Sequence, residues 1–203
     1  LGIKKKSRAQ KAILGSTARY VILKAPCPVT TVKFELADMT AADLLKDRQI
    51  LVVDDEPDIL ETIKELLDTC FIDTAATFED AQKYLENRFY DAAILDIMGV
   101  RGYDILTLAQ DKGIVSLMLT AHALTPENLK ESIQKGANAY IPKDELFNID
   151  AHLANAIKSH LAGKKEDSAW FFTLKPVFDK VFGSGWKERD KPFWNSMDDR
   201  YGR

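Results

Sequence analysis

The stretch Ile50-Leu51-Val52-Val53-Asp54-Asp55-Glu56-Pro57 decides the fold, because an apolar run gives way within it to acids and then to proline. A short run of consecutive apolar, largely β-branched residues is typical of a strand buried on both faces, so we expect a strand from Gln49 to Val53. Proline is favoured in the first turn of a helix, and apolar side chains then recur at helical spacing. The stretch therefore predicts a buried strand followed by a helix from Pro57 to Thr69.

The same alternation of strand and helix continues along the chain. The expected later strands are residues 71–75, 92–95, 114–119 and 139–141, and the expected later helices are residues 79–87, 103–110, 126–135 and one that ends near 161. This alternation predicts an α/β fold, in which a parallel sheet is covered by helices on both faces.

The composition predicts a globular protein of the cytoplasm. The 203 residues are 46% hydrophobic and carry a formal net charge of −3. Basic residues gather before the first acid, Glu35, but a block of this size is more often a solvated surface than a nucleic-acid site. No apolar run reaches the roughly 20 residues of a membrane helix. Cys27 and Cys70 lack metal-ligand spacing, which favours reduced core thiols.

Polar side chains stand at the ends of four expected strands. Asp54 and Asp55 follow the first strand, Asp96 the third, Thr120 the fourth and Lys143 the fifth. The carboxyl ends of parallel strands meet at one edge of a sheet, where ligands bind. Three neighbouring carboxylates repel one another unless a cation neutralises them, and an all-oxygen site of this kind suits Mg²⁺.

This set of residues is suited to phosphoryl chemistry. An aspartate beside Mg²⁺ can attack a phosphoryl group, while the Lys143 ammonium neutralises one phosphoryl oxygen. The hydroxyl of Thr120 can hydrogen-bond another oxygen and draw its loop inward. Taken singly, Asp54 and Asp55 fit helix capping and Lys143 fits a solvated lysine. Their joint placement favours the functional interpretation.

Four motifs resemble the receiver domains of two-component response regulators. They are Ile50-Leu51-Val52-Val53-Asp54-Asp55-Glu56-Pro57, Ile94-Leu95-Asp96-Ile97-Met98, Leu119-Thr120-Ala121 and Tyr140-Ile141-Pro142-Lys143. The resemblance implies a doubly wound, five-stranded parallel sheet of order 2-1-3-4-5. It also implies phosphorelay signalling, in which a sensor histidine kinase or a phosphotransfer protein is the phosphoryl donor.

The resemblance assigns a role to each site residue. Asp96 is the phosphoacceptor, and it ligates Mg²⁺ together with Asp55 and the backbone carbonyl of Met98. Asp54 acts on the metal partly through water. Lys143 and Thr120 complete the reacting set, and no cofactor other than Mg²⁺ is implied.

Tyr140 matches the aromatic residue that turns inward after phosphorylation in this family, coupled to Thr120. Without the resemblance, Tyr140 is an ordinary strand aromatic.

Two features depart from the family pattern. The loop from Met98 to Gly102 is short and lacks the usual proline, so we expect it to be tighter and differently shaped. Asp144 follows Lys143 where a proline is common. Neither departure removes a reacting group.

The N-terminal residues 1–37 are similar to the last helix and strand of universal stress proteins. Gly2 and Gly15 match part of that family's nucleotide-binding glycine pattern, but Lys5 stands where another glycine belongs. We expect no competent nucleotide site here, and we expect the chain to be a piece of a longer fusion. Residues 38–48 are predicted to be a linker, and residues 49–162 the receiver domain.

Residues 163–203 form an aromatic-rich C-terminal tail. It contains Trp170, Phe171, Phe172, Phe178, Phe182, Trp186, Phe193, Trp194 and Tyr201. Such a cluster favours packing against the receiver or docking on a partner, whereas its mixed charges disfavour nucleic-acid binding. Receivers also commonly form homodimers through the fourth helix, fifth strand and fifth helix, which here are residues 126–135, 139–141 and 149–161.

Two alternative functions remain to be weighed. A phosphatase of the haloacid dehalogenase type also uses an aspartate nucleophile and Mg²⁺, but it places a second acid two residues later, where this chain has Met98. A non-phosphorylated adaptor with the same fold would lack one of the reacting residues, and none is missing. We therefore expect a phosphoacceptor that catalyses only its own phosphorylation and dephosphorylation, and no turnover of outside substrates.

Overall fold

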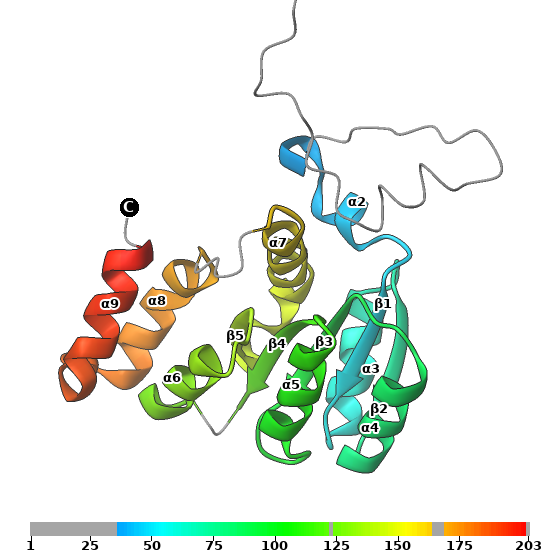
Figure 1. Ribbon diagram of the computed structural model, residues 1–203, viewed down its shortest axis with the longest axis horizontal. Coiled ribbons are helices and arrows are strands. Elements are labelled where there is room, and N and C mark those ends of the chain that lie inside the picture. Colours follow the sequence, from blue (N-terminus) through cyan, green and yellow to red (C-terminus); the bar gives the residue numbers. More distant parts are fainter. Residues whose placement is uncertain (1–35, 122–123, 164–168, 202–203) are drawn as a thin grey trace, which may run out of the picture. The chain divides into compact units, whose positions relative to one another are not determined.

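The computed structural model describes residues 36–121, 124–163 and 169–201, and its centre alternates strands with helices as expected. The elements are β1 (Gln49–Val53), α3 (Pro57–Leu66), β2 (Phe71–Ala75), α4 (Phe78–Asn87), β3 (Ala92–Asp96), α5 (Gly102–Asp111), β4 (Val115–Thr120), α6 (Pro126–Gln134), β5 (Ala139–Pro142) and α7 (Ile149–Leu161). The strands form one parallel sheet of order β2-β1-β3-β4-β5, which confirms the predicted fold class (Figure 1).

The sheet is the core of the unit that spans Leu36–Arg203. Every residue of β3 and β4 is buried, and only Gln49 of β1 is exposed. The register sets Val53 beside Leu95 and Asp96 beside Leu119. β1, β3 and β4 therefore end at the same edge of the sheet. Their apolar residues are buried in the sheet, and the polar residues come at the carboxyl ends of the strands.

Most element boundaries lie within one residue of those predicted, and α3 is the main exception. It ends at Leu66 rather than Thr69, and the backbone N–H of Leu67 closes its last turn on the carbonyl of Ile63. Asp68 and Thr69 are weak helix formers, because their side chains compete for backbone hydrogen bonds. β3 and β4 also extend one residue further than expected, and so include Asp96 and Thr120.

The stretch predicted as a linker contains two helical elements, η2 (Leu36–Asp38) and α2 (Ala41–Leu45). Thr40 caps α2, because its side chain accepts a hydrogen bond from the Asp43 backbone N–H at 3.1 Å. Leu44 and Leu45 are buried, and α2 packs on α7. A further helical turn, η3 (Lys143–Asn148), joins β5 to α7.

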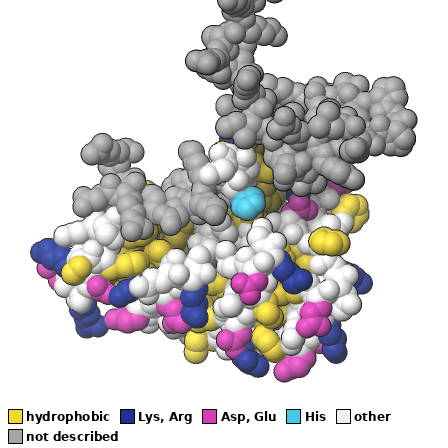
Figure 2. Space-filling view, viewed as in Figure 1, with side chains coloured by type: hydrophobic (Ala, Val, Ile, Leu, Met, Phe, Trp, Pro, Cys, Tyr) yellow, Lys and Arg dark blue, Asp and Glu magenta, His cyan; other side chains and the backbone are white. Residues whose placement is uncertain are grey.

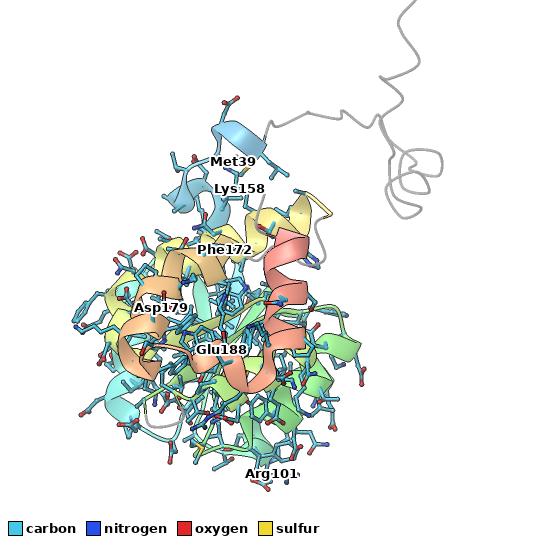
Figure 3. The ribbon with its side chains drawn as sticks, turned by 90° about the vertical axis from the view of Figure 1, so that its left-hand side faces the viewer. Met39, Arg101, Lys158, Phe172, Asp179 and Glu188 are labelled. Carbon is cyan, nitrogen blue, oxygen red and sulfur yellow. The ribbon has the colours of Figure 1, made fainter. Side chains whose placement is uncertain are left out.

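The aromatic-rich end of the chain forms α8 (Ala169–Phe182), η4 (Trp186–Asp190) and α9 (Lys191–Tyr201). We call residues 169–201 the C-terminal helical pair. α8 packs on β5 and on α7, so the pair covers the edge strand of the sheet. Of the two predicted alternatives, packing against the receiver is the one observed (Figures 1 and 3).

The N-terminal helix and strand, predicted within residues 1–37, fall almost wholly outside the described residues. Within the described ranges, no helix combines the length and the apolar character needed to cross a bilayer.

Candidate functional site

Three strand ends bring two aspartates and a lysine into contact. Asp54 directly follows β1, Asp96 is the last residue of β3, and Lys143 directly follows β5. The Lys143 Nζ lies 2.8 Å from Asp54 Oδ2 and 3.0 Å from Asp96 Oδ1. The sheet therefore gathers these predicted residues at one polar edge, and the lysine bridges the two acids.

Glu56 also belongs to this polar edge, although it was not among the predicted site residues. Its Oε1 lies 2.7 Å from the Lys143 Nζ, and its backbone N–H donates to Asp54 Oδ1 at 3.0 Å. Its position just after the paired aspartates was a usable signal in the sequence. An exposed glutamate at a helix N-terminus, however, is ordinarily no more than a favourable charge there.

Burial and neighbouring charges shift the pKa values of the polar-edge side chains in opposite directions. Asp54 is fully buried, and this burial raises the pKa of its carboxyl group. Burial alone would lower the pKa of Lys143, but hydrogen bonds to Asp54, Glu56 and Asp96 outweigh it and raise that pKa. Lys143 is thus a firmly held positive charge among three carboxylates.

The second carboxylate oxygen of Asp96 is held by the loop that follows β3. Asp96 Oδ2 accepts hydrogen bonds from the backbone N–H groups of Met98 and Gly99, at 2.8 and 2.9 Å. A Cβ at Gly102 would lie only 1.9 Å from the backbone oxygen of Asp96. The short loop therefore folds back on the aspartate and requires glycine where it passes the strand end.

The same loop closes through a residue in the left-handed region. Arg101 has a φ of 55°, which L-residues seldom adopt, and it immediately precedes α5. Its guanidinium lies 4.1 Å from the centre of the Phe78 ring and forms an ion pair of 2.7 Å with Asp104. These contacts hold the loop in place, and none of them involves a residue of the polar edge.

Thr120 and Tyr140 lie on neighbouring strands and are both buried. Thr120 is 1% exposed, and its side chain hydrogen-bonds with the hydroxyl of Tyr140. Tyr140 is fully buried, and this burial raises the pKa of its hydroxyl. Its ring centre lies 6.1 Å from that of Phe178 in α8. The tyrosine is therefore turned inward beneath the C-terminal helical pair.

The donor set at the polar edge suits Mg²⁺ chemically, although its ligands are not gathered into a cage. Asp54, Asp55 and Asp96 offer carboxylate oxygens, and Met98 offers a backbone carbonyl. Among the residues described here, no three or more His, Cys, Asp or Glu side chains lie close enough together to hold a metal. Lys143 supplies the positive charge between two of these acids, while the Asp55 side chain is exposed.

The fold and the polar edge together define the class of protein: an α/β receiver with an acidic site at the carboxyl ends of its strands. The family model of the response regulator receiver domain matches residues 50–154, about half of the chain. The chain belongs to this family. The universal stress protein family model also matches residues 1–33, in agreement with the predicted resemblance.

Known proteins agree with this assignment. Over 100 residues the chain is 39% identical to the heme response regulator HssR of Staphylococcus aureus, a match that covers 47% of this chain and 44% of that protein. The chain thus spans less than half the length of this curated relative. A response regulator receiver domain protein from Clostridium thermocellum is 28% identical, with a TM-score of 0.51, over 57% of this chain and 98% of that one.

The predicted function class is confirmed at this level. The central domain is a response regulator receiver, which takes part in phosphorelay signalling within two-component systems. Neither the phosphatase nor the non-phosphorylated adaptor is favoured by these similarities.

Proposed function

We propose that Asp96 accepts the phosphoryl group and that Lys143 stabilises it. The observation that carries this proposal is the lysine bridge, in which one ammonium lies 3.0 Å from Asp96 Oδ1 and 2.8 Å from Asp54 Oδ2. A positive charge held beside the attacking carboxylate can neutralise the phosphoryl oxygens as they approach. Lys143 needs no large movement to do so.

The chemistry assigned to the site is an in-line transfer. An oxygen of Asp96 attacks the phosphorus of a phosphohistidine, the bond from phosphorus to the imidazole nitrogen breaks, and an acyl phosphate forms. Asp54, Asp55, Asp96 and the Met98 carbonyl would hold Mg²⁺, which neutralises phosphoryl charge when bound. The N–H groups of Met98 and Gly99 keep Asp96 oriented for the attack.

Thr120 and Tyr140 form the proposed switch. The Thr120 hydroxyl is buried beside the Tyr140 hydroxyl, so a charged phosphoryl oxygen would compete with the tyrosine for its hydrogen bond. Movement of Thr120 toward the phosphoryl group leaves room for the inward ring of Tyr140. The inward ring is therefore the position that we assign to the phosphorylated state.

The proposed partner is a sensor histidine kinase or a phosphotransfer protein, and the proposed compartment is the cytoplasm. We expect no catalytic turnover beyond the receiver's own phosphorylation and dephosphorylation. Nucleic-acid binding is disfavoured for the face in Figure 2, because acidic and basic side chains are interspersed over it. The borders at residues 37, 48 and 162 stay predictions. A homodimer through residues 126–135, 139–141 and 149–161 also stays a prediction, and it would require the C-terminal helical pair to leave that surface.

Beryllium fluoride with Mg²⁺ tests the assignment, since it mimics a phosphoryl group on an aspartate. The wild type should bind it, as followed by fluorine NMR, and acetyl phosphate should add one phosphoryl group detected by mass spectrometry. Asp96→Asn should abolish both signals, whereas the control Asp144→Asn, at an exposed aspartate, should keep them. A phosphoryl group found on another residue would refute the role of Asp96.

Release of phosphate from a generic phosphomonoester separates the receiver from the phosphatase. We expect no sustained release with the wild type. Many turnovers per protein molecule would overturn the non-enzymatic assignment.

A further inference from the structure

We propose that the C-terminal helical pair is the receiver's own docking partner: it occupies the surface of α6, β5 and α7, and its docking is strengthened when Asp96 is phosphorylated. This inference rests on the proposed function, because it assigns a readout to the switch of Thr120 and Tyr140. Three features carry it: aromatic packing on the switch tyrosine, charge pairing with α6, and overlap with the predicted dimer surface.

The aromatic packing connects the pair directly to the switch. Phe178 of α8 is fully buried and lies against Tyr140, with 6.1 Å between the ring centres. Phe171 lies 6.0 Å from Phe178 and is stacked on Trp194 of α9, also at 6.0 Å. Phe171 and Trp194 are 0% and 1% exposed. A continuous aromatic cluster thus runs from the switch tyrosine through both helices.

This packing makes docking depend on the position of Tyr140. β5 is the edge strand of the sheet, and α8 covers it. Tyr140 and Phe178 are both fully buried against each other, so a change in the position of the tyrosine ring would disturb the packing of Phe178. Interiors packed at this density do not admit an extra ring without displacing one. The docked pair is therefore compatible with the inward ring alone.

Charge pairing holds the other side of the pair to α6. Lys130 of α6 forms an ion pair with Asp190 of η4, and its ammonium lies 5.3 Å from the centre of the Phe193 ring. Arg189 lies 3.6 Å from Glu127. A groove of about 590 Å³ remains between α6 and the helices that face it. Charges are paired across this side of the contact and the groove is incompletely filled, which suits a reversible interaction.

The surface that the pair covers is the one predicted for a homodimer. α8 packs on β5 and α7, and η4 and α9 lie on α6. A second copy of the chain therefore cannot use this surface while the pair is docked. If phosphorylation strengthens docking, the phosphorylated receiver should not dimerise through this surface.

Thermodynamic linkage predicts the size of the coupling between docking and analogue binding. If a phosphoryl analogue on Asp96 favours docking, docking must favour binding of the analogue by the same factor. Couplings of this kind are about 5- to 150-fold. Loss of docking should therefore weaken analogue binding by at least about fivefold.

The experiment uses the full chain, and hydrogen exchange and tryptophan fluorescence are measured with and without beryllium fluoride and Mg²⁺. All three tryptophans, Trp170, Trp186 and Trp194, lie in the helical pair and report on its packing. The analogue should slow amide exchange in α8 at least about fivefold. Sedimentation should show a monomer with and without the analogue.

Phe178→Ala is the variant that should uncouple the pair from the switch. It should remove the protection of α8 and weaken analogue binding about fivefold or more, while exchange in β1 and β3 stays slow. Val181→Ala, at a 52% exposed site on the same helix, is the matched control and should behave as the wild type.

Three results overturn the proposal. If the analogue binds Asp96 but leaves α8 exchange unchanged, or speeds it, the coupling is wrong while the proposed function stands. If analogue binding is equally tight in Phe178→Ala and the wild type, the pair does not read the switch. If the analogue does not bind the wild type at all, the proposed function fails and the coupling fails with it.

Discussion

The polar edge of the sheet and the C-terminal helical pair are held together by different forces. At the polar edge, one lysine ammonium contacts Asp54, Glu56 and Asp96, and most of its stabilisation is electrostatic. In the helical pair, the largest buried side chains are aromatic, and apolar burial dominates. The first region should therefore respond to pH, metal and phosphoryl groups, and the second to changes in side-chain volume.

Tyr140 is where the two regions meet. It is on the strand that leads to Lys143, yet its ring packs on Phe178 of the helical pair. A change at the polar edge can reach the aromatic cluster through this one strand. In the proposed function, this difference separates the chemistry, at the polar edge, from the readout, in the helical pair, and β5 connects the two regions.

Removing an aromatic ring from the helical pair should give the largest effect on stability. Phe171 is fully buried, so Phe171→Ala should lower the free energy of unfolding by about 3–5 kcal/mol. Urea denaturation followed by circular dichroism measures the loss. Phe89→Ala is the control, because Phe89 is 96% exposed and its loss should change stability by less than about 0.5 kcal/mol. Equal effects of the two changes would contradict the packing described for α8.

The two glycines of the loop after β3 should differ from each other. A Cβ at Gly102 meets the backbone oxygen of Asp96 at 1.9 Å, and backbone cannot easily move aside. Gly102→Ala should therefore destabilise the fold by about 1–3 kcal/mol in urea denaturation.

At Gly99 the Cβ meets the exposed side chain of Asp55, with 2.1 Å to its Oδ1. That side chain can swing away, so Gly99→Ala should cost less stability than Gly102→Ala. It should nevertheless weaken Mg²⁺ binding in calorimetric titration, because Asp55 is displaced. A larger stability loss for Gly99→Ala would show that the loop is held differently.

The polar edge was the more predictable of the two regions. Alternating apolar runs predicted the strands, and the edge follows from the rule that carboxyl ends of parallel strands meet. Asp54, Asp96 and Lys143 could thus be placed together from the amino-acid sequence alone. The bridging role of Glu56 was missed, because which side chain reaches Lys143 depends on rotamers rather than on sequence pattern.

The helical pair was predictable only in composition. Its aromatic residues indicated burial, but their spacing is interrupted by Pro176 within α8 and by Gly183 and Gly185 after it. Proline inside a helix runs against intrinsic propensity, and tertiary packing overrides that preference here. The contact with β5 joins residues far apart in the chain, and no local pattern reports such a contact.

Asp54→Asn should reveal how much the burial of the charged Asp54 carboxylate reduces the stability of the fold. Burial raises the pKa of Asp54 above its ordinary value of 3.8, so the folded state binds its proton more readily than the unfolded state does. Stability contributed by this group is therefore lost as pH rises above 3.8 through the folded-state pKa. At pH 7 and without metal, Asp54→Asn should raise the free energy of unfolding by about 0.5–2 kcal/mol.

The gain from Asp54→Asn should shrink as the pH falls toward 3.8. Urea denaturation of both proteins in a chelating buffer, repeated from neutral to acid pH, measures it. Asp144→Asn, at an exposed aspartate, is the control and should show no such trend. A gain that stays constant over this pH range would mean that Asp54 does not carry the electrostatic cost.

The smallest expected effect lies where the helical pair meets α6, and it tests whether charge contributes to docking at all. Lys130 and Asp190 form a partly exposed ion pair, with 30% and 35% of their side chains exposed. Such pairs are worth about 0.2–1 kcal/mol, so Asp190→Lys should destabilise the protein by about that amount. Lys130→Asp combined with Asp190→Lys should restore most of the loss, because the attraction is rebuilt with reversed signs. Comparing the double variant with both single variants in urea at low salt isolates the pairwise energy. Additive effects would show that the pair of Lys130 and Asp190 does not hold the helical pair on α6.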